Sequence, residues 1–137
     1  MKFEKSEYIK YLIEKSNTTF EDSVFLANGL RWNSATNRLY YSAFYCIRAL
    51  LSCIELSPKT HKGVKNMFYL HFISKDLFES KYSLFFSQLF DARQESDYVD
   101  YIIQTEESVA LMLVQTLEFI DVISRYIKEN YLNQIDG

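Results

Sequence analysis

Apolar side chains recur every three or four positions along most of the chain, which is the spacing of one face of an α-helix. No segment keeps the two-residue alternation of a strand. Local signals mark helix ends: Asn28-Gly29 and Pro58 are stop signals, and Thr105 is a cap followed by two glutamates. The pattern predicts five helices, over residues 4–27, 33–56, 61–74, 80–98 and 106–128.

Long helices with few connections predict an all-α fold, an up-and-down bundle of about five helices. The 137 residues include only three glycines and one proline, which suits few turns. Residues 1–132 are predicted to form a single bundle and residues 133–137 a frayed tail. Residues 16–19 are weak helix formers, so the first helix could bend or break there. Predicted buried positions are Tyr8, Leu12, Phe20, Val24 and Leu26 in the first helix and Leu84, Phe85, Leu89 and Ala92 in the fourth.

Charge is unevenly spread over a chain whose formal net charge is −3. Between residues 31 and 65 there are six lysines and arginines and one acid, Glu55, whereas acids dominate from Tyr69 onward. The basic segment could bind an anion, or it could pair with the acidic helices of its own chain. Charge alone favours the second interpretation.

Most familiar enzyme classes find no support in the sequence. It has no glycine-rich phosphate loop, no His-Glu-x-x-His segment and no glycine-flanked serine. Cys46 and Cys53 lie two helical turns apart, too far to bond to each other, and have no partner at zinc spacing. We therefore predict buried free thiols in a reducing cytoplasm, no metal and no cofactor. No apolar run is long enough to span a bilayer and no signal region is evident, so no membrane association is predicted.

Three short segments carry the candidate chemistry. In the second predicted helix, steps of three and four align Arg38, Tyr41 or Ser42, Tyr45 and Arg48. Such a stripe of guanidinium groups and phenols can hold phosphates and stack bases. The same stripe can instead be a helix interface in which each arginine pairs with an acid of the fourth or fifth helix. The residues alone slightly favour the helix interface over ligand binding.

Each of the other two segments, taken alone, gives weaker evidence of a function. Thr60-His61-Lys62-Gly63 begins a helix, where a histidine beside a lysine more often makes a cap or surface contact than binds a ligand. In the fourth helix Arg93 and Asp97 are four residues apart, which favours a simple surface ion pair.

Together and in this order, the three segments resemble the HEPN family of helical bundles. In its bacterial and archaeal branch the second helix carries Arg-x-Tyr-Tyr-Ala, followed by Ser/Thr-His-Lys-Gly and then Arg-x-x-x-Asp-Tyr. The corresponding residues here are Arg38-Leu39-Tyr40-Tyr41-Ser42, Thr60-His61-Lys62-Gly63 and Arg93-Gln94-Glu95-Ser96-Asp97-Tyr98. Ser42 departs from the usual alanine. The resemblance covers approximately residues 31–123.

The resemblance implies a homodimer of up-and-down bundles, often encoded beside a minimal nucleotidyltransferase and often acting as a toxin or defence ribonuclease. The family's metal-independent cleavage site is an arginine followed, after four to six residues, by a histidine, with two copies facing each other across the dimer. Arg93 matches the arginine, but Tyr98 stands where the histidine belongs. A phenol with a pKa of about 10 is a poor general base at neutral pH. A separation of five residues also places the two side chains on different faces unless the helix ends there.

We therefore predict a dimeric HEPN-like protein that binds RNA, a nucleotide or a nucleotidyltransferase partner in a toxin–antitoxin or defence-type system. Two alternatives stay open: a metal-independent ribonuclease toxin, and a purely structural dimeric adaptor whose surplus of aromatic residues forms an interface. The catalytic candidates are Arg93 and Tyr98. The ligand-binding candidates are Arg38, Tyr41, Arg48, His61, Lys62, Arg93 and Asp97.

Overall fold

The computed structural model describes residues 2–133, with side chains from Glu4 onward. No described residue belongs to a strand, so the predicted all-α class is confirmed. The tail predicted at 133–137 lies, beyond Asn133, outside the described residues. The helices are α1 (Lys2–Asn28), α2 (Trp32–Cys53), α3 (His61–Phe68), α4 (Ser80–Tyr98) and α5 (Glu106–Ile127), with the π-helical turns η1 (Tyr69–Ile73) and η2 (Lys128–Leu132) extending α3 and α5.

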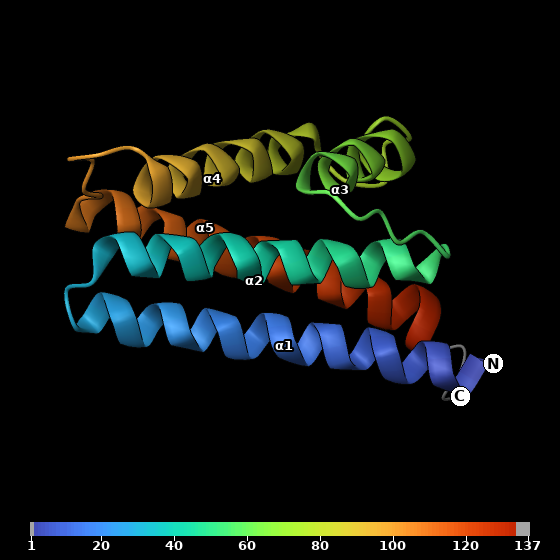
Figure 1. The fold of residues 1–137 in the computed structure, drawn as a ribbon. Helices are drawn as coiled ribbons and strands as arrows, with labels where there is room; N and C mark the ends of the chain where they lie inside the picture. Colours follow the sequence, from blue (N-terminus) through green and yellow to red (C-terminus); the bar gives the residue numbers. More distant parts are fainter. Residues whose placement is uncertain (1, 134–137) are drawn as a thin grey trace.

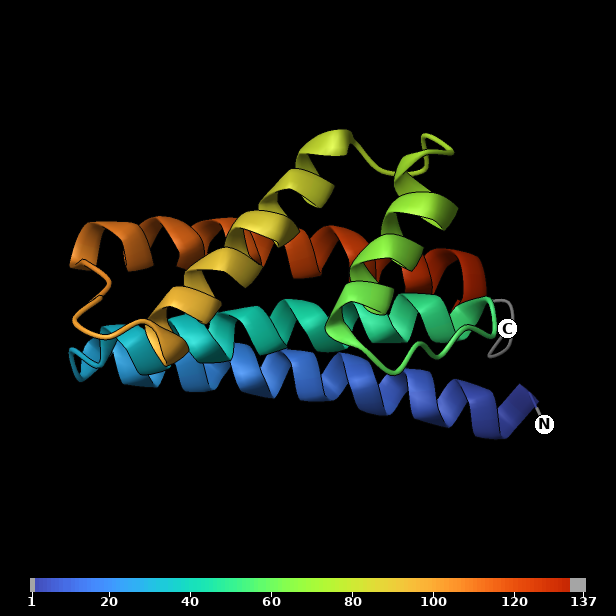
Figure 2. The ribbon, with the colours of Figure 1, turned by 45° about the horizontal axis from the view of Figure 1, so that its top comes forward.

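The bundle is arranged around α2. Helices α1, α2 and α5 lie side by side along the length of the molecule (Figure 1). Helix α4 crosses this layer at an angle, and α3 lies on the same side of the layer, the two helices converging toward the segment that joins them (Figure 2). Since α2 contacts all four of the other α-helices, its side chains reach both the α1 side and the α3–α4 side of the fold.

Helix α1 is continuous through the weak helix formers at 16–19. The side chain of Ser16 donates a hydrogen bond to the carbonyl oxygen of Ser42 on α2 at 2.7 Å, and Ser42 returns one to the carbonyl of Ser16 at 2.9 Å. Both serines are buried, so each small polar side chain is satisfied where α1 and α2 approach closely. Tertiary packing therefore stabilises a segment whose intrinsic helix propensity is low.

The core is rich in stacked aromatic rings. Phe119 of α5 stacks on Phe86 of α4 with ring centres 6.0 Å apart, and Phe86 stacks in turn on Tyr40 of α2 at 5.6 Å. Three of the positions predicted to be buried are exposed instead: Tyr8, Val24 and Leu84. For the first two the reason is that α1 packs chiefly on one neighbour, α2, so its buried stripe is narrower than the periodicity suggests.

Two helix ends differ from the expected stop signals. Leu30, not Gly29, adopts the left-handed conformation after α1, with φ of 63°, while the amide of Arg31 bonds the carbonyl of Leu26. Helix α2 ends in the same way at Glu55, with φ of 62°, before Pro58 is reached. Non-glycine residues therefore occupy positions that glycine fills at lower energy.

We expect Leu30→Gly to raise the free energy of unfolding by about 0.5–1 kcal/mol, since it removes left-handed strain of about 1–2 kcal/mol and adds a smaller cost in unfolded-chain entropy. Leu30 is 68% exposed, so little packing is lost. Urea unfolding measures the change. Gly29→Ala is the matched control: its Cβ would lie 3.5 Å or more from its neighbours, so it should be tolerated. Strong destabilisation by Gly29→Ala would contradict this account of the helix end.

Candidate functional site

The guanidinium of Arg93, on α4, lies between phenol rings of α2 and α4. The residue is only 8% exposed. Its Nη2 donates to the hydroxyl of Tyr41 at 3.0 Å and to that of Tyr98 at 3.5 Å. The guanidinium carbon lies 5.2 Å from the ring centre of Tyr41, 5.4 Å from that of Tyr98 and 5.6 Å from that of Tyr40. Three electron-rich rings thus stabilise a cation that is largely withdrawn from water.

Asp97 is the counter-ion of Arg93. Its Oδ2 lies 3.0 Å from Nε of Arg93, although the N–H does not point along this line, so the contact is an ion pair without an aligned hydrogen bond. The predicted pairing is confirmed, and Asp97 is an exposed residue as predicted, but Arg93 is buried, with a side chain only 10% exposed. The pair is therefore screened less by solvent than an exposed one.

Asn37 connects this pair to a second arginine. Its Nδ2 donates to Oδ2 of Asp97 at 2.9 Å, and its Oδ1 accepts from Nε and Nη2 of Arg38 at 3.0 and 2.8 Å. The guanidinium of Arg38 also lies 5.2 Å from the ring centre of Tyr41. Because Asn37 donates with one end and accepts with the other, two cations and one carboxylate share a single network. We refer to Asn37, Arg38, Tyr41, Arg93, Asp97 and Tyr98 as the Arg93 cluster.

Tyr98 reaches Arg93 because it is the last residue of α4. An uninterrupted helix would have placed the two side chains on different faces. Tyr98 remains 69% exposed, so it covers the guanidinium from the solvent side.

Folding brings His61 beside the cluster, although it lies 32 positions before Arg93 in the sequence. Its Nδ1 is 2.7 Å from the hydroxyl of Tyr40, and its ring stacks on Phe44 with centres 4.6 Å apart. Burial, and secondly the charge of Arg93, lower the pKa of His61 below its ordinary value. Burial raises the pKa of Tyr40. The imidazole is consequently neutral at pH 7 and can accept a proton.

Two predicted ligand-binding residues lie apart from the cluster. Arg48 is ten residues beyond Arg38 on α2 and bonds the hydroxyl of Tyr8 on α1 at 2.8 Å. Lys62 is exposed on α3. Neither arginine of α2 forms an ion pair with a described acid, so the expected pairing with helices four and five is wrong for both. Arg38 bonds an amide and Arg48 a phenol instead.

Sequence reasoning did not identify Asn37 or Tyr40 as site residues. Asn37 directly precedes the Arg-x-Tyr-Tyr segment, and Tyr40 is the first tyrosine within it. Their position at this segment was therefore the only feature of the sequence that could have marked Asn37 and Tyr40 as site residues. Their roles as connectors to Asp97 and His61 depend on contacts across the fold.

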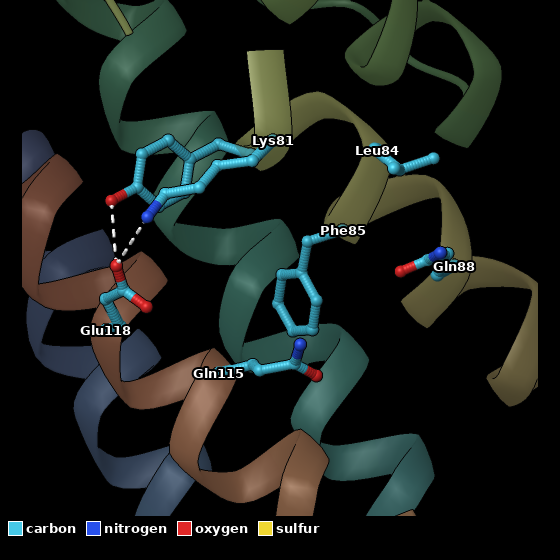
Figure 3. Close-up of a pocket in the computed structure, with 7 residues that line it drawn as sticks. Lys81, Leu84, Phe85, Gln88, Gln115 and Glu118 are labelled. Carbon is cyan, nitrogen blue, oxygen red and sulfur yellow. Dashed lines mark hydrogen bonds and ion pairs between the residues drawn. The ribbon is translucent and has the colours of Figure 1, made fainter. Parts of the chain in front are cut away.

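A groove of about 530 Å³ opens beside the cluster, lined by residues from the ends of α1 and α4 and from the start of α2. Arg38, Asn37 and Asp97 form part of its wall, together with Asn33, whose amide bonds the carbonyl of Ile102 at 2.9 Å. A different cavity, of about 190 Å³, lies between α4 and α5 and contains no predicted site residue (Figure 3). There Glu118 accepts from Lys81 at 3.2 Å and from Tyr82 at 3.1 Å, so its charged groups satisfy one another.

Within residues 2–133 no group of three or more His, Cys, Asp or Glu side chains is placed to hold a metal ion. The same residues include no helix with the length and apolar character needed to cross a membrane.

The family model for the HEPN domain matches residues 9–127 of the chain. The chain belongs to the HEPN family. The match includes all of α2 to α5 and every residue of the Arg93 cluster, so the resemblance inferred from the three segments is confirmed.

Individual HEPN relatives cover nearly the whole chain. "Putative toxin MJ0142" of Methanocaldococcus jannaschii is 32% identical over 119 residues, which are 87% of this chain and 81% of the relative. "Putative toxin MJ0605" of the same organism is 30% identical, covering 90% of this chain and 91% of the relative. A UPF0332 protein of Thermotoga maritima is 29% identical, covering 92% and 96%.

Proposed function

We propose that this HEPN protein is a toxin-like protein that binds single-stranded RNA through the Arg93 cluster. The observation that carries the proposal is the arrangement of Arg93 and Arg38 around one carboxylate, which leaves the cluster with net positive charge. Within the described residues, Nη1 of Arg93 makes no hydrogen bond and is not fully buried. A phosphate oxygen in the adjacent groove can meet the guanidinium of Arg38, which lines that groove and uses Nε and Nη2 to bond Asn37, while the charge of Arg93 adds to the attraction. The names of two relatives support the toxin-like role.

Arg38→Gln should weaken RNA binding at least about tenfold, because it removes one phosphate-binding charge from a site with two. Fluorescence anisotropy with a labelled single-stranded RNA measures the affinity, at two salt concentrations. Arg125→Gln is the control, since Arg125 is an exposed cation paired with Asp121 on α5. Equal affinities of Arg38→Gln and wild type would contradict the assigned site.

We also propose that the protein is a homodimer whose interface adjoins the Arg93 cluster. Exposed apolar side chains continue from the end of α4 through the following loop onto α5, and such a surface marks an interface. They are Tyr98, Val99, Tyr101, Ile102, Ile103, Leu111, Val114 and Leu117.

Light scattering should give about twice the 16.3 kDa mass of the chain for wild type, and the single mass for Leu111→Glu with Val114→Glu. Leu70→Glu, an equally apolar and exposed site on η1, should remain dimeric. A wild-type monomer at micromolar concentration would refute this interface. A dimer that binds no RNA would favour the structural adaptor instead.

A nucleotidyltransferase partner is proposed from family membership alone. A nucleotidyltransferase encoded in the adjacent reading frame, whose product co-purifies with this protein, would support it.

A second candidate function, metal-independent RNA cleavage, is favoured by one specific observation. His61 lies beside the Arg93 cluster with a lowered pKa, so a neutral imidazole is available even though Tyr98 occupies the family's histidine position. In this proposal the ribose 2′-oxygen attacks the phosphorus and the 5′-oxygen leaves; His61 takes the proton of the 2′-hydroxyl and returns it to the departing 5′-oxygen, while Arg93 stabilises the charge that develops on the phosphate.

A further inference from the structure

A second cavity lies between α3 and α4. Its volume is about 300 Å³, which is at the small end of ligand pockets and suits a single ring system better than an extended segment. Six residues line it: His61, Lys62, Lys65, Asn66, Phe86 and Phe90. Only His61 belongs to the surroundings of the Arg93 cluster.

The walls of this cavity are flat and apolar. Phe86 is buried and held by stacking on Phe119 at 6.0 Å with an angle of 11° between the rings. Phe90 is half-buried and meets Tyr40 edge to face, with centres 5.6 Å apart. Since these rings are fixed by the core, the aromatic wall is already formed before any ligand enters.

The rim of the cavity is basic and polar. Lys62 and Lys65 are exposed, and neither forms an ion pair with any carboxylate in the described part of the chain. Asn66, also exposed, offers both a donor and an acceptor at the same edge. Apolar rings inside and free cations outside complement a molecule with a flat ring at one end and phosphate at the other.

His61 connects this cavity to the Arg93 cluster. Its ring centre is 6.4 Å from that of Phe90 in the cavity and 5.9 Å from that of Tyr41 in the cluster. Both sites therefore border the same imidazole, close enough together to contact one nucleic acid strand.

We propose that the α3–α4 cavity receives one unstacked nucleobase of the RNA strand held at the Arg93 cluster, while Lys62 and Lys65 hold a neighbouring phosphate. This inference rests on the proposed RNA binding and names its substrate class, a single strand with a base free to leave the stack. Base and phosphate together are the chemistry recognised, and they could also come from a free nucleotide.

The test compares an intact labelled RNA hexamer with a hexamer of the same backbone that lacks bases. Phe90→Leu should weaken binding of the intact strand about tenfold, as expected for losing one stacked base, and leave the baseless strand unaffected. Lys65→Gln should weaken both strands and reduce the salt dependence. The matched controls are Phe85→Leu, which alters the other cavity, and Lys128→Gln on η2.

Equal affinity of wild type for both strands, or of Phe90→Leu and wild type for the intact strand, would overturn the proposal. If Phe90→Leu fails to fold by circular dichroism, Asn66→Ala provides the same comparison from the exposed rim. Displacement of the RNA by micromolar AMP or CMP, but not by ribose 5-phosphate, would overturn the assignment to RNA and make the free nucleotide the ligand. Loss of affinity in Arg38→Gln with none in Phe90→Leu would leave the proposed function standing and remove only the base pocket.

Discussion

Arg93→Ala is expected to lower both the stability of the protein and its affinity for RNA. The substitution leaves Asp97 without its cation and the hydroxyls of Tyr41 and Tyr98 without their donor, and it empties the buried position of the guanidinium. Breaking a partly buried ion pair of this kind costs about 2–4 kcal/mol, which corresponds to a decrease in melting temperature of roughly 10 °C. Thermal unfolding followed by circular dichroism measures the loss.

A stability loss alone would not distinguish a binding residue from a structural one. Two further variants distinguish a role of Arg93 in RNA binding from a role in stability alone. Arg93→Lys keeps the charge but loses the planar fork, so it should weaken RNA binding more than it weakens the fold. Asp97→Asn removes the competing carboxylate and should strengthen RNA binding several-fold if Arg93 meets a phosphate.

The opposite pattern would show that Arg93 is only structural. In that case Arg93→Lys, assayed below its melting temperature, binds RNA as wild type does, and Asp97→Asn leaves the affinity unchanged. A buried arginine paired with an acid can matter to stability alone, because removal of either partner leaves the other charge uncompensated. RNA affinity, measured below the melting temperature of each variant, therefore decides the role.

His61→Asn is expected to abolish any RNA cleavage, by a factor of about 100 or more, and to lower RNA affinity far less than that, since His61 is one of six residues that line the α3–α4 cavity. The asparagine keeps a polar group near the hydroxyl of Tyr40 but cannot take up a proton at neutral pH. Cleavage of a labelled RNA in the presence of a chelator measures the effect. His71→Asn, on η1, is the control, because it changes the other histidine of the chain.

The pH dependence of cleavage follows from the direction of the pKa shift. Burial and the charge of Arg93 lower the pKa of His61, so its proton-accepting form persists to lower pH than that of an ordinary histidine. The rate should therefore begin to decrease at a lower pH than it would with an ordinary histidine as the base. Intact RNA after long incubation with wild type, together with harmless overexpression in cells, would rule out the ribonuclease alternative.

The sequence alone was sufficient for the fold class and most of the helix bounds. Periodicity located α4 at Ser80–Tyr98, and the polar residue at Thr105 was correctly expected to cap α5, where it forms a capping box with Ser108. Both features depend on residues no more than four positions apart along the chain. Local spacing therefore carries the information that specifies them.

Tertiary structure decided how the candidate residues meet. The burial of Ser16 against Ser42, the bond from Asn37 to Asp97 and the approach of His61 to Tyr40 each join different helices. No spacing rule predicts such contacts, because they depend on the crossing of α4 over α2 and on the position of the α3 start. The sequence determined which side chains with useful chemistry are present, and helix packing determined which of them share a site.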